Sequence, residues 1–346
     1  MAEVEAPSAS QRGPQLDSTA PSEPKRESPA GTSLQLALQG QLRAAVTPTT
    51  ENVPWVSDVD VPRIRTKIKA LLGSSELAVQ INTSPDKLEW VDLYADVPLG
   101  EAFRMRLGQH KIAFGLYRQQ SNFDLVFTDW SPTTRFFGAE RQLGITGSAF
   151  GDGMVGLSFG AYAGDNARAS HGVGAARLNG VELGNRSSFV ERESYTTLHP
   201  ELVARVVGRH ALGEFSGSVA WDSDPTDTDF RTRATIDALF HTSSWTLWSA
   251  LYAAATTSRP DSLGALGEIS YTVSDAWSVG ARYSWLDTSW ALDALDVVDA
   301  PETTHEWTGS VRFDPTEDLT LQVEGNVISA PGETDFGGRV QLGFRL

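Results

Sequence analysis

The 346-residue sequence contains no cysteine, which excludes disulfide bonds, thiolate metal sites and cysteine nucleophiles. It also lacks any run of about 18 apolar residues, so no transmembrane helix is expected. Basic residues are few: 28 Lys and Arg against 44 Asp and Glu leave a net charge of −16, which argues against a nucleic-acid partner. The first residues show neither the basic start nor the apolar core of a signal peptide, so an exported protein would be represented here by its mature form.

The chain divides into two parts of different composition. Residues 1–32 are rich in Pro, Ser, Glu and Lys, and we predict that they are disordered because they cannot bury enough apolar surface. Residues 33–346 consist of short segments in which apolar and polar residues alternate, a pattern typical of β-strands with one apolar face. Sixteen such strands are expected, at 33–46, 62–72, 75–83, 87–97, 102–111, 141–149, 153–163, 199–209, 213–222, 231–241, 244–255, 263–273, 276–286, 305–314, 318–328 and 336–346.

The connections between these strands alternate in length. Most connections after even-numbered strands are turns of two to four residues, whereas most after odd-numbered strands are longer, up to the 164–198 connection. Short turns at one end and long loops at the other are typical of a transmembrane barrel. The last segment, Phe336 to Leu346, alternates to its final residue, as expected for a strand with a neighbour on each side. The sequence therefore predicts an all-β fold: a single transmembrane antiparallel β-barrel of about 16 strands.

Aromatic residues on the apolar face support this prediction. One group lies near the short turns and a smaller group near the long loops, as expected for two aromatic belts at the membrane interfaces. The first group is Phe103, Phe215, Phe240, Trp245, Tyr271, Trp277, Phe313 and Phe344, and the second is Trp221, Trp285, Trp307 and Phe336. A soluble β-sandwich or propeller also alternates, but it does not explain both the belts and the loop asymmetry.

The polar face of the strands should line the lumen, and it carries more basic than acidic side chains. Such a wall would raise the local concentration of anions. The alternative is that these bases pair with lumen acids across strands and stiffen the wall. The candidate pore-lining bases are Arg43, Arg63, Arg65, Lys67, Lys69, Arg104, Arg106, Arg339 and Arg345.

The 112–140 connection has the length and composition of a loop that folds inward. It is rich in Phe and Trp, and folding into the lumen would bury those rings. An outer plug or a contact between subunits is the competing interpretation. The candidate charged residues in and beside this constriction loop are Lys111, Arg118, Asp124, Asp129, Arg135 and Arg141.

Three motifs resemble the phosphate-selective porin O and P family. They are Gly108-Gln-His-Lys-Ile-Ala-Phe-Gly115, Ser121-Asn-Phe-Asp-Leu-Val-Phe127 and Gly138-Ala-Glu-Arg-Gln-Leu-Gly-Ile145. The resemblance is strongest over residues 87–160. It implies a sixteen-stranded outer-membrane porin, commonly a trimer, with a basic lumen, and it assigns importance to Lys111, Arg104, Arg106 and Arg141. The chain departs from the family pattern at Ala113, at Glu140-Arg141-Gln142 and at its last residue.

Enzyme motifs and metal sites are not convincing in this sequence. Gly156-Leu-Ser-Phe-Gly160 matches a hydrolase pattern that requires a turn between a strand and a helix, yet it falls inside an alternating strand. The six His residues lack metal-ligand spacing, and the acidic 222–229 segment lacks the spacing of a helix-loop-helix calcium site. We therefore expect no enzyme activity, no cofactor and no metal.

Together these features predict a porin of a Gram-negative outer membrane that passes small hydrophilic solutes and prefers anions, including phosphate-like ones. Its expected partners are outer-membrane lipid and lipopolysaccharide, small anions, and two further copies in a homotrimer. The alternative is a non-conducting barrel that serves as a scaffold, an adhesin or the sheath of an envelope complex.

Overall fold

The computed structural model describes residues 32–47, 56–84, 87–138, 141–151, 154–163, 200–222, 232–255, 261–287, 303–330 and 333–346. The N-terminal segment whose disorder we predict lies outside these residues, apart from Thr32. Most of the expected long connections also lie outside them, so the predicted asymmetry of loop length stays a prediction.

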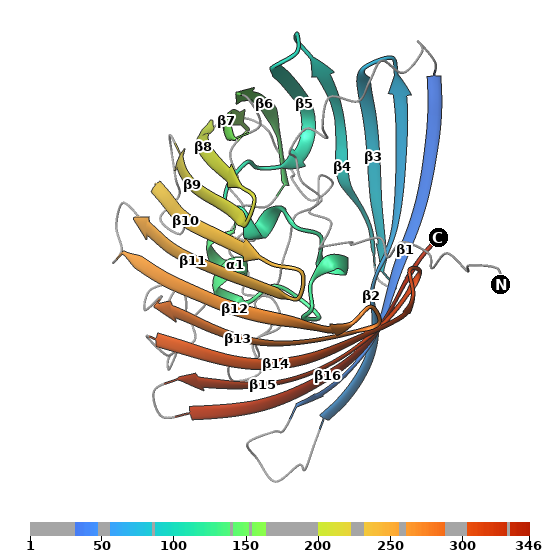
Figure 1. The fold of residues 1–346 in the computed structure, drawn as a ribbon, viewed down its shortest axis with the longest axis vertical. Helices are drawn as coiled ribbons and strands as arrows, with labels where there is room; N and C mark the ends of the chain where they lie inside the picture. The colour runs from blue at the N-terminus through green and yellow to red at the C-terminus, as the bar shows by residue number, and fades with distance from the viewer. Residues whose placement is uncertain are drawn as a thin grey trace, which may run out of the picture.

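Sixteen strands close into one antiparallel barrel, in which each strand pairs with its neighbours in sequence and β16 pairs with β1 (Figure 1). This confirms the predicted all-β fold and the predicted number of strands. The strands are β1 (Thr32–Thr47), β2 (Val56–Leu72), β3 (Ser75–Ser84), β4 (Lys87–Pro98), β5 (Phe103–Lys111), β6 (Arg141–Gly151), β7 (Val155–Tyr162), β8 (Glu201–His210), β9 (Gly213–Asp222), β10 (Thr232–His241), β11 (Trp245–Ala255), β12 (Ser262–Ser274), β13 (Trp277–Asp287), β14 (Thr303–Thr316), β15 (Leu319–Ala330) and β16 (Glu333–Arg345).

The barrel closes where the last strand meets the first. Arg345 lies opposite Gln39 and Leu342 opposite Leu42 in the β1–β16 register. The final residue still takes part: the Leu346 N–H donates to the Leu38 carbonyl at 2.8 Å, and the Leu38 N–H donates to the Leu346 carbonyl at 2.9 Å. Every residue of the terminal pattern therefore has a partner, and the barrel has no free edge at this seam.

Several strands extend beyond their predicted ends, and β2 extends the furthest. The expected second strand begins at residue 62, but β2 begins at Val56. Proline has no N–H for the ladder, so Pro62 reads as a boundary in the sequence. In the structure the β1–β2 register shifts between Gln41 and Arg43, next to this proline, and the ladder continues beyond it. The bulge accommodates the missing donor, and the extension places Asp60 opposite Arg43.

The burial pattern is the reverse of that in a water-soluble protein. Along β15, Gln322 and Glu324 are buried, whereas Leu321 and Val323 between and beside them are exposed. The same alternation holds for most described strands, and the exposed side is largely aliphatic. Polar side chains inside the barrel can form hydrogen bonds with one another. A polar side chain on the outer surface would find no such partners, so apolar residues lie there.

Aromatic side chains pair on the outer surface near the short turns. The ring centroids of Trp245 and Tyr271 are 4.5 Å apart, and those of Phe215 and Phe240 are 5.0 Å apart. At the other end, Trp307 is 58 % exposed. These five aromatic residues therefore lie on the outer face near the ends of the strands, where the sequence analysis places them.

Three short helices interrupt the chain between β5 and β6: η1 (Tyr117–Gln119), η2 (Asn122–Asp124) and α1 (Pro132–Phe137). None of the helices in the described ranges is long and apolar enough to cross a membrane.

Gly108 provides a test of the β4–β5 packing. Its φ is +119°, and a Cβ atom there would lie 2.2 Å from the Leu93 carbonyl oxygen. Gly108→Ala should lower the free energy of unfolding by about 1–3 kcal/mol because it adds backbone strain and a clash. Gly309→Ala is the control, since a Cβ atom at that strand position meets nothing within 4 Å. Unfolding followed by tryptophan fluorescence in detergent checks this, and equal losses in the two variants would contradict it.

Candidate functional site inside the barrel

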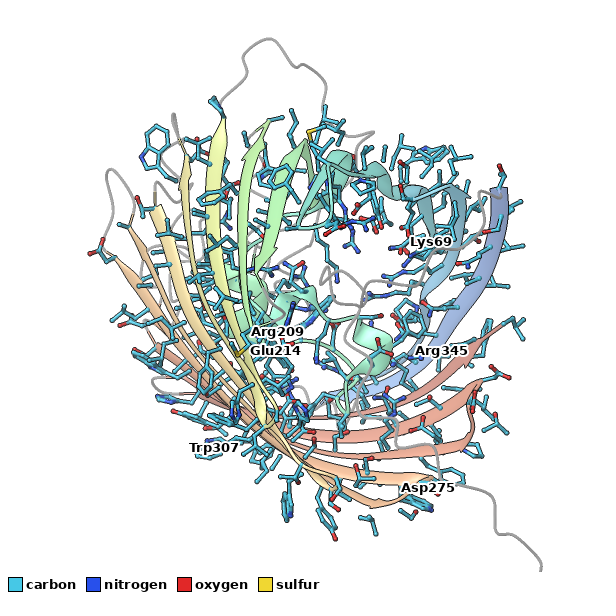
Figure 2. The ribbon with its side chains drawn as sticks, turned by 45° about the horizontal axis from the view of Figure 1, so that its top comes forward. Lys69, Arg209, Glu214, Asp275, Trp307 and Arg345 are labelled. Atoms are coloured by element: carbon cyan, nitrogen blue, oxygen red, sulfur yellow. The ribbon has the colours of Figure 1, made fainter. Side chains whose placement is uncertain are left out.

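Residues 112–138, here called the inner segment, lie inside the ring of strands (Figures 1 and 2). Local capping explains how the segment turns. The Ser121 side chain accepts from the Phe123 N–H at the start of η2, and the Ser131 side chain accepts from the Thr134 N–H at the start of α1. Each cap satisfies a backbone donor that a short helix leaves unpaired.

The inner segment packs its aromatic rings against one side of the wall. Tyr117 lies edge-on to Trp248 of β11, with ring centroids 5.1 Å apart. Phe137 stacks on Tyr252 of the same strand at 5.3 Å. A Cβ atom at Gly264 of β12 would lie 2.5 Å from the Phe137 ring, so only glycine leaves room for it. The rings form a buried apolar cluster within the polar lumen.

Buried acidic and basic side chains of the wall anchor the same segment. Glu324 accepts from the Thr128 N–H at 2.9 Å and from its hydroxyl at 3.0 Å. Arg282 donates to the Asp129 carbonyl at 2.7 Å. Tyr117 donates its hydroxyl to Glu268. Burial, together with the negative charge of Glu268, raises the pKa of Tyr117, so this hydroxyl keeps the proton that it donates.

Many candidate pore-lining bases pair with acids on the same or adjacent strands. Arg43 lies 2.6 Å from Asp60, Lys69 lies 3.1 Å from Glu76, and Arg339 lies 3.2 Å from Glu324. Arg104 and Arg106 share Asp96, at 2.7 and 2.6 Å. Arg65 donates to Asn82 at 3.1 Å. The pairing that the sequence analysis left open is therefore present, and at Asp96 two bases share one acid.

The candidate bases in and beside the constriction loop form a second group. Lys111, the last residue of β5, donates to the Gln119 and Gln120 carbonyls at 3.1 and 2.9 Å. The guanidinium of Arg118 lies 3.8 Å from the centroid of the Trp130 ring, a cation–π contact.

The remaining candidates pair with carboxylates. Arg141, the first residue of β6, donates to Asp92 at 2.7 Å, Arg135 pairs with Asp129 in the inner segment, and Arg345 of β16 pairs with Asp124 at 2.6 Å.

Arg135 shows where positive charge gathers. Burial lowers the pKa of Arg135, and the charges of Arg63, Arg118, Arg339 and Arg43 lower it further. These guanidinium groups come from β1, β2, β16 and the inner segment, so the fold brings together bases that are far apart in the sequence. Lys67 lies on β2 in the same alternating row as Arg63.

Sequence reasoning missed the two glycines that admit the inner segment. A Cβ atom at Gly264 or Gly280 would come within about 3 Å of it, at Phe137 and Phe127 respectively. Glycine on the inward face of a strand is a signal of close backbone approach, and this could have identified both positions. The sequence also does not reveal that wall side chains such as Arg282 and Glu324 hold the segment.

The hydrolase-like motif lies inside β7, as expected. Its Ser158 hydroxyl is 3.2 Å from the Ser148 hydroxyl of the neighbouring strand. Across the ranges that the structure describes, no three His, Cys, Asp or Glu side chains are grouped as metal ligands.

No family model matches the chain, and no curated protein sequence matches it. Solved structures do match its fold. The outer-membrane channel DcaP of Acinetobacter baumannii is 13 % identical, with a TM-score of 0.62 over 93 % of this chain and 99 % of that one. An anion-selective porin from Comamonas acidovorans is 11 % identical, with a TM-score of 0.65 over 91 % and 100 %. OprB of Pseudomonas putida is 10 % identical, with a TM-score of 0.63 over 92 % and 94 %.

At these identities the comparisons show that the chain has the fold of outer-membrane channels. Membership of the phosphate-selective family stays a prediction.

Gly264 tests how closely the inner segment packs on the wall. Gly264→Val should force Phe137 and Thr133 away and cost about 1–3 kcal/mol of unfolding free energy, because overpacked sites relax only partly. Gly267→Val on the same strand is the control, since a Cβ atom there meets nothing within 4 Å. Chemical unfolding and near-ultraviolet circular dichroism check both variants. An unchanged aromatic spectrum in Gly264→Val would contradict the packing.

Proposed function

We propose that this protein is an outer-membrane channel through which small hydrophilic solutes diffuse passively. A closed barrel satisfies every ladder hydrogen bond internally, and its exposed aliphatic band and aromatic ends suit a bilayer. The charged interior would hold water. The fold shared with DcaP, OprB and the anion-selective porin supports the same function.

The channel prefers anions, and the alternating row of Arg63, Arg65, Lys67 and Lys69 on β2 carries this part of the proposal, supported by the bases around Arg135. Most of the hydrogen bonds that anchor the inner segment come from β7 to β16, for example from Arg282 and Glu324, and Lys111 at the end of β5 adds two more. We place the path of solutes between the segment and the wall of β2 to β4, where Lys69 lies on the inner side (Figure 2). A cationic wall in a narrow aqueous passage concentrates anions. The resemblance of residues 87–160 to phosphate-selective porins extends the solute class to phosphate-like anions.

Outer-membrane lipid and lipopolysaccharide would surround the barrel, and the same resemblance implies a homotrimer.

A non-conducting barrel is the second candidate. The apolar cluster around Tyr117, Phe137 and Trp248 occupies part of the lumen, as it would in a scaffold or a sheath. Single-channel recording in planar bilayers separates the two candidates, because a barrel filled in this way would carry no current.

Reversal potentials in a salt gradient test the anion preference. Lys67→Glu combined with Lys69→Glu changes four charge units and also leaves Glu76 without its Lys69 partner. The ratio of anion to cation permeability should fall by more than about tenfold in low salt, since each charge unit interacts by about 0.5 kcal/mol with an ion roughly 8 Å away in water.

The matched control replaces both lysines by Arg, which keeps the charge and should keep the potential. Cation preference in the unaltered protein would refute the anion claim and leave the channel intact.

A further inference from the structure

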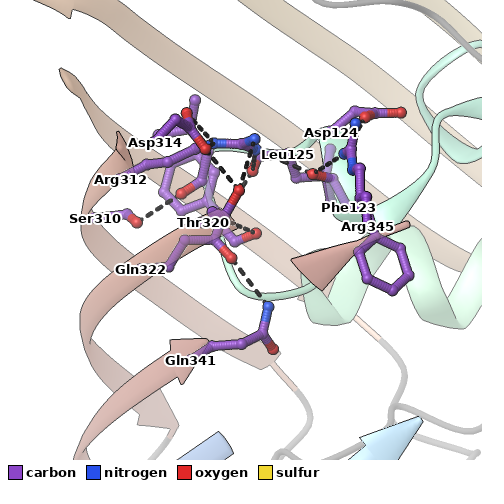
Figure 3. A network of polar contacts seen from close by, with 12 residues as sticks. Phe123, Asp124, Leu125, Ser310, Arg312, Asp314, Thr320, Gln322, Gln341 and Arg345 are labelled. Atoms are coloured by element: carbon purple, nitrogen blue, oxygen red, sulfur yellow. Dashed lines mark hydrogen bonds and ion pairs between the residues drawn. The ribbon is translucent and has the colours of Figure 1, made fainter. Parts of the chain in front are cut away.

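After η2 the inner segment runs without regular structure from Leu125 to Ser131. Side chains of the barrel wall donate hydrogen bonds to backbone carbonyls between Phe123 and Phe127. Arg312 donates to the Phe123 and Leu125 carbonyls at 3.1 and 2.7 Å. Gln322 donates to the Leu125 and Phe127 carbonyls at 2.8 and 3.2 Å, and Ser310 donates to the Val126 carbonyl at 2.7 Å. Buried carbonyls without partners would be costly, so these bonds fix the path of the segment (Figure 3).

The donors are themselves held in place. Asp314 accepts from the Arg312 Nε at 2.8 Å, and the Thr320 hydroxyl donates to Asp314 at 2.6 Å. Gln341 donates to the Gln322 side-chain oxygen at 2.9 Å. Arg312 is thereby oriented with its Nη1 toward the segment, while its Nη2 donates to the Thr320 hydroxyl at 3.4 Å. We call Ser310, Arg312, Gln322 and Arg345 the β14–β16 anchor.

Arg345 holds the tip of the segment at the barrel seam. One of its nitrogens donates to the Phe123 carbonyl at 2.7 Å and to Asp124 at 2.6 Å. Its guanidinium lies 6.0 Å from the centroid of the Phe123 ring, and that of Arg65 lies 5.5 Å from the same centroid. Both arginines sit opposite Gln39 of β1, one on each side. The Phe123 ring therefore covers the seam formed by β16, β1 and β2.

We infer that Arg345 is a positioning residue that sets the width of the passage by holding the tip of the inner segment against the β16–β1–β2 seam. This rests on the proposed channel function and divides the inward bases into two kinds. Bases of the β14–β16 anchor position the segment, whereas Lys67 and Lys69 of β2 act on the solute through their charge.

The two roles predict opposite results when a base is removed. Loss of a charge that only attracts anions lowers anion passage and leaves the size limit unchanged. Loss of Arg345 leaves the Phe123 carbonyl to Arg312 alone and releases Asp124, so the tip loosens and the passage widens even for uncharged solutes. Neutral sugars report width without responding to charge, and liposome swelling with sugars of increasing size measures the limit.

Arg345→Met should admit larger sugars and raise single-channel conductance, by about twofold, because pore diameter controls passage. Arg345→Lys keeps the charge but has a single ammonium in place of the forked donor, so it should give an intermediate limit. Asp124→Ala removes the partner from the segment and leaves the wall and seam intact. Asp124→Ala should also raise the size limit for sugars, and it tests the same contact if Arg345→Met fails to fold. Arg209→Gln is the control, because Arg209 pairs with Glu214 between β8 and β9 and its loss should not change the size limit (Figure 2).

An unchanged sugar limit in both Arg345→Met and Asp124→Ala would overturn the positioning role, even if anion preference fell. Unaltered protein that conducts neither ions nor sugars would instead refute the proposed channel.

Discussion

The structure depends on the closure of one hydrogen-bonded ladder between the first and last strands. Leu38 and Leu346 exchange backbone hydrogen bonds at this seam, so the described strands form a ring without an edge. Once the backbone is satisfied within the ring, side chains no longer need an apolar interior. Aliphatic and aromatic residues can face outward and charged residues inward, which is the arrangement observed.

The inner segment introduces a second constraint inside that ring. Its irregular backbone cannot join the ladder, so its carbonyls require donors from the wall. Arg312, Gln322 and Arg345 supply them, and Glu324 accepts from Thr128. The inward charges therefore do structural work as well as shaping the field of the lumen. A count of charges would assign every inward base the role of attracting anions. The contacts of these bases show that some bind the inner segment, whereas others line the passage.

The fold was predictable from the sequence because each side chain of a barrel strand points either inward or outward, and apolar and polar residues alternate accordingly. The strand pattern gave sixteen strands, and the structure has sixteen. The error at β2 has a physical reason: Pro62 lacks a donor and reads as a boundary, yet the bulge next to it lets the ladder continue to Val56. Within the site, the charged candidates could be assigned to a face but not to partners. The pairing of Arg345 with Asp124 joins residues 221 positions apart, which no local pattern reveals.

The sequence by itself determined the class of fold, the number of strands and, for most strands, which residues face inward and which face outward. These properties follow from local periodicity and composition. Only the tertiary structure decided which bases gather around Arg135, which acids they meet and where the inner segment lies, because these depend on the register between strands and on close packing at Gly264 and Gly280. The alternation of inward and outward side chains repeats every two residues, so it can be predicted from the sequence alone. Contacts across the lumen depend instead on how the ring of strands closes.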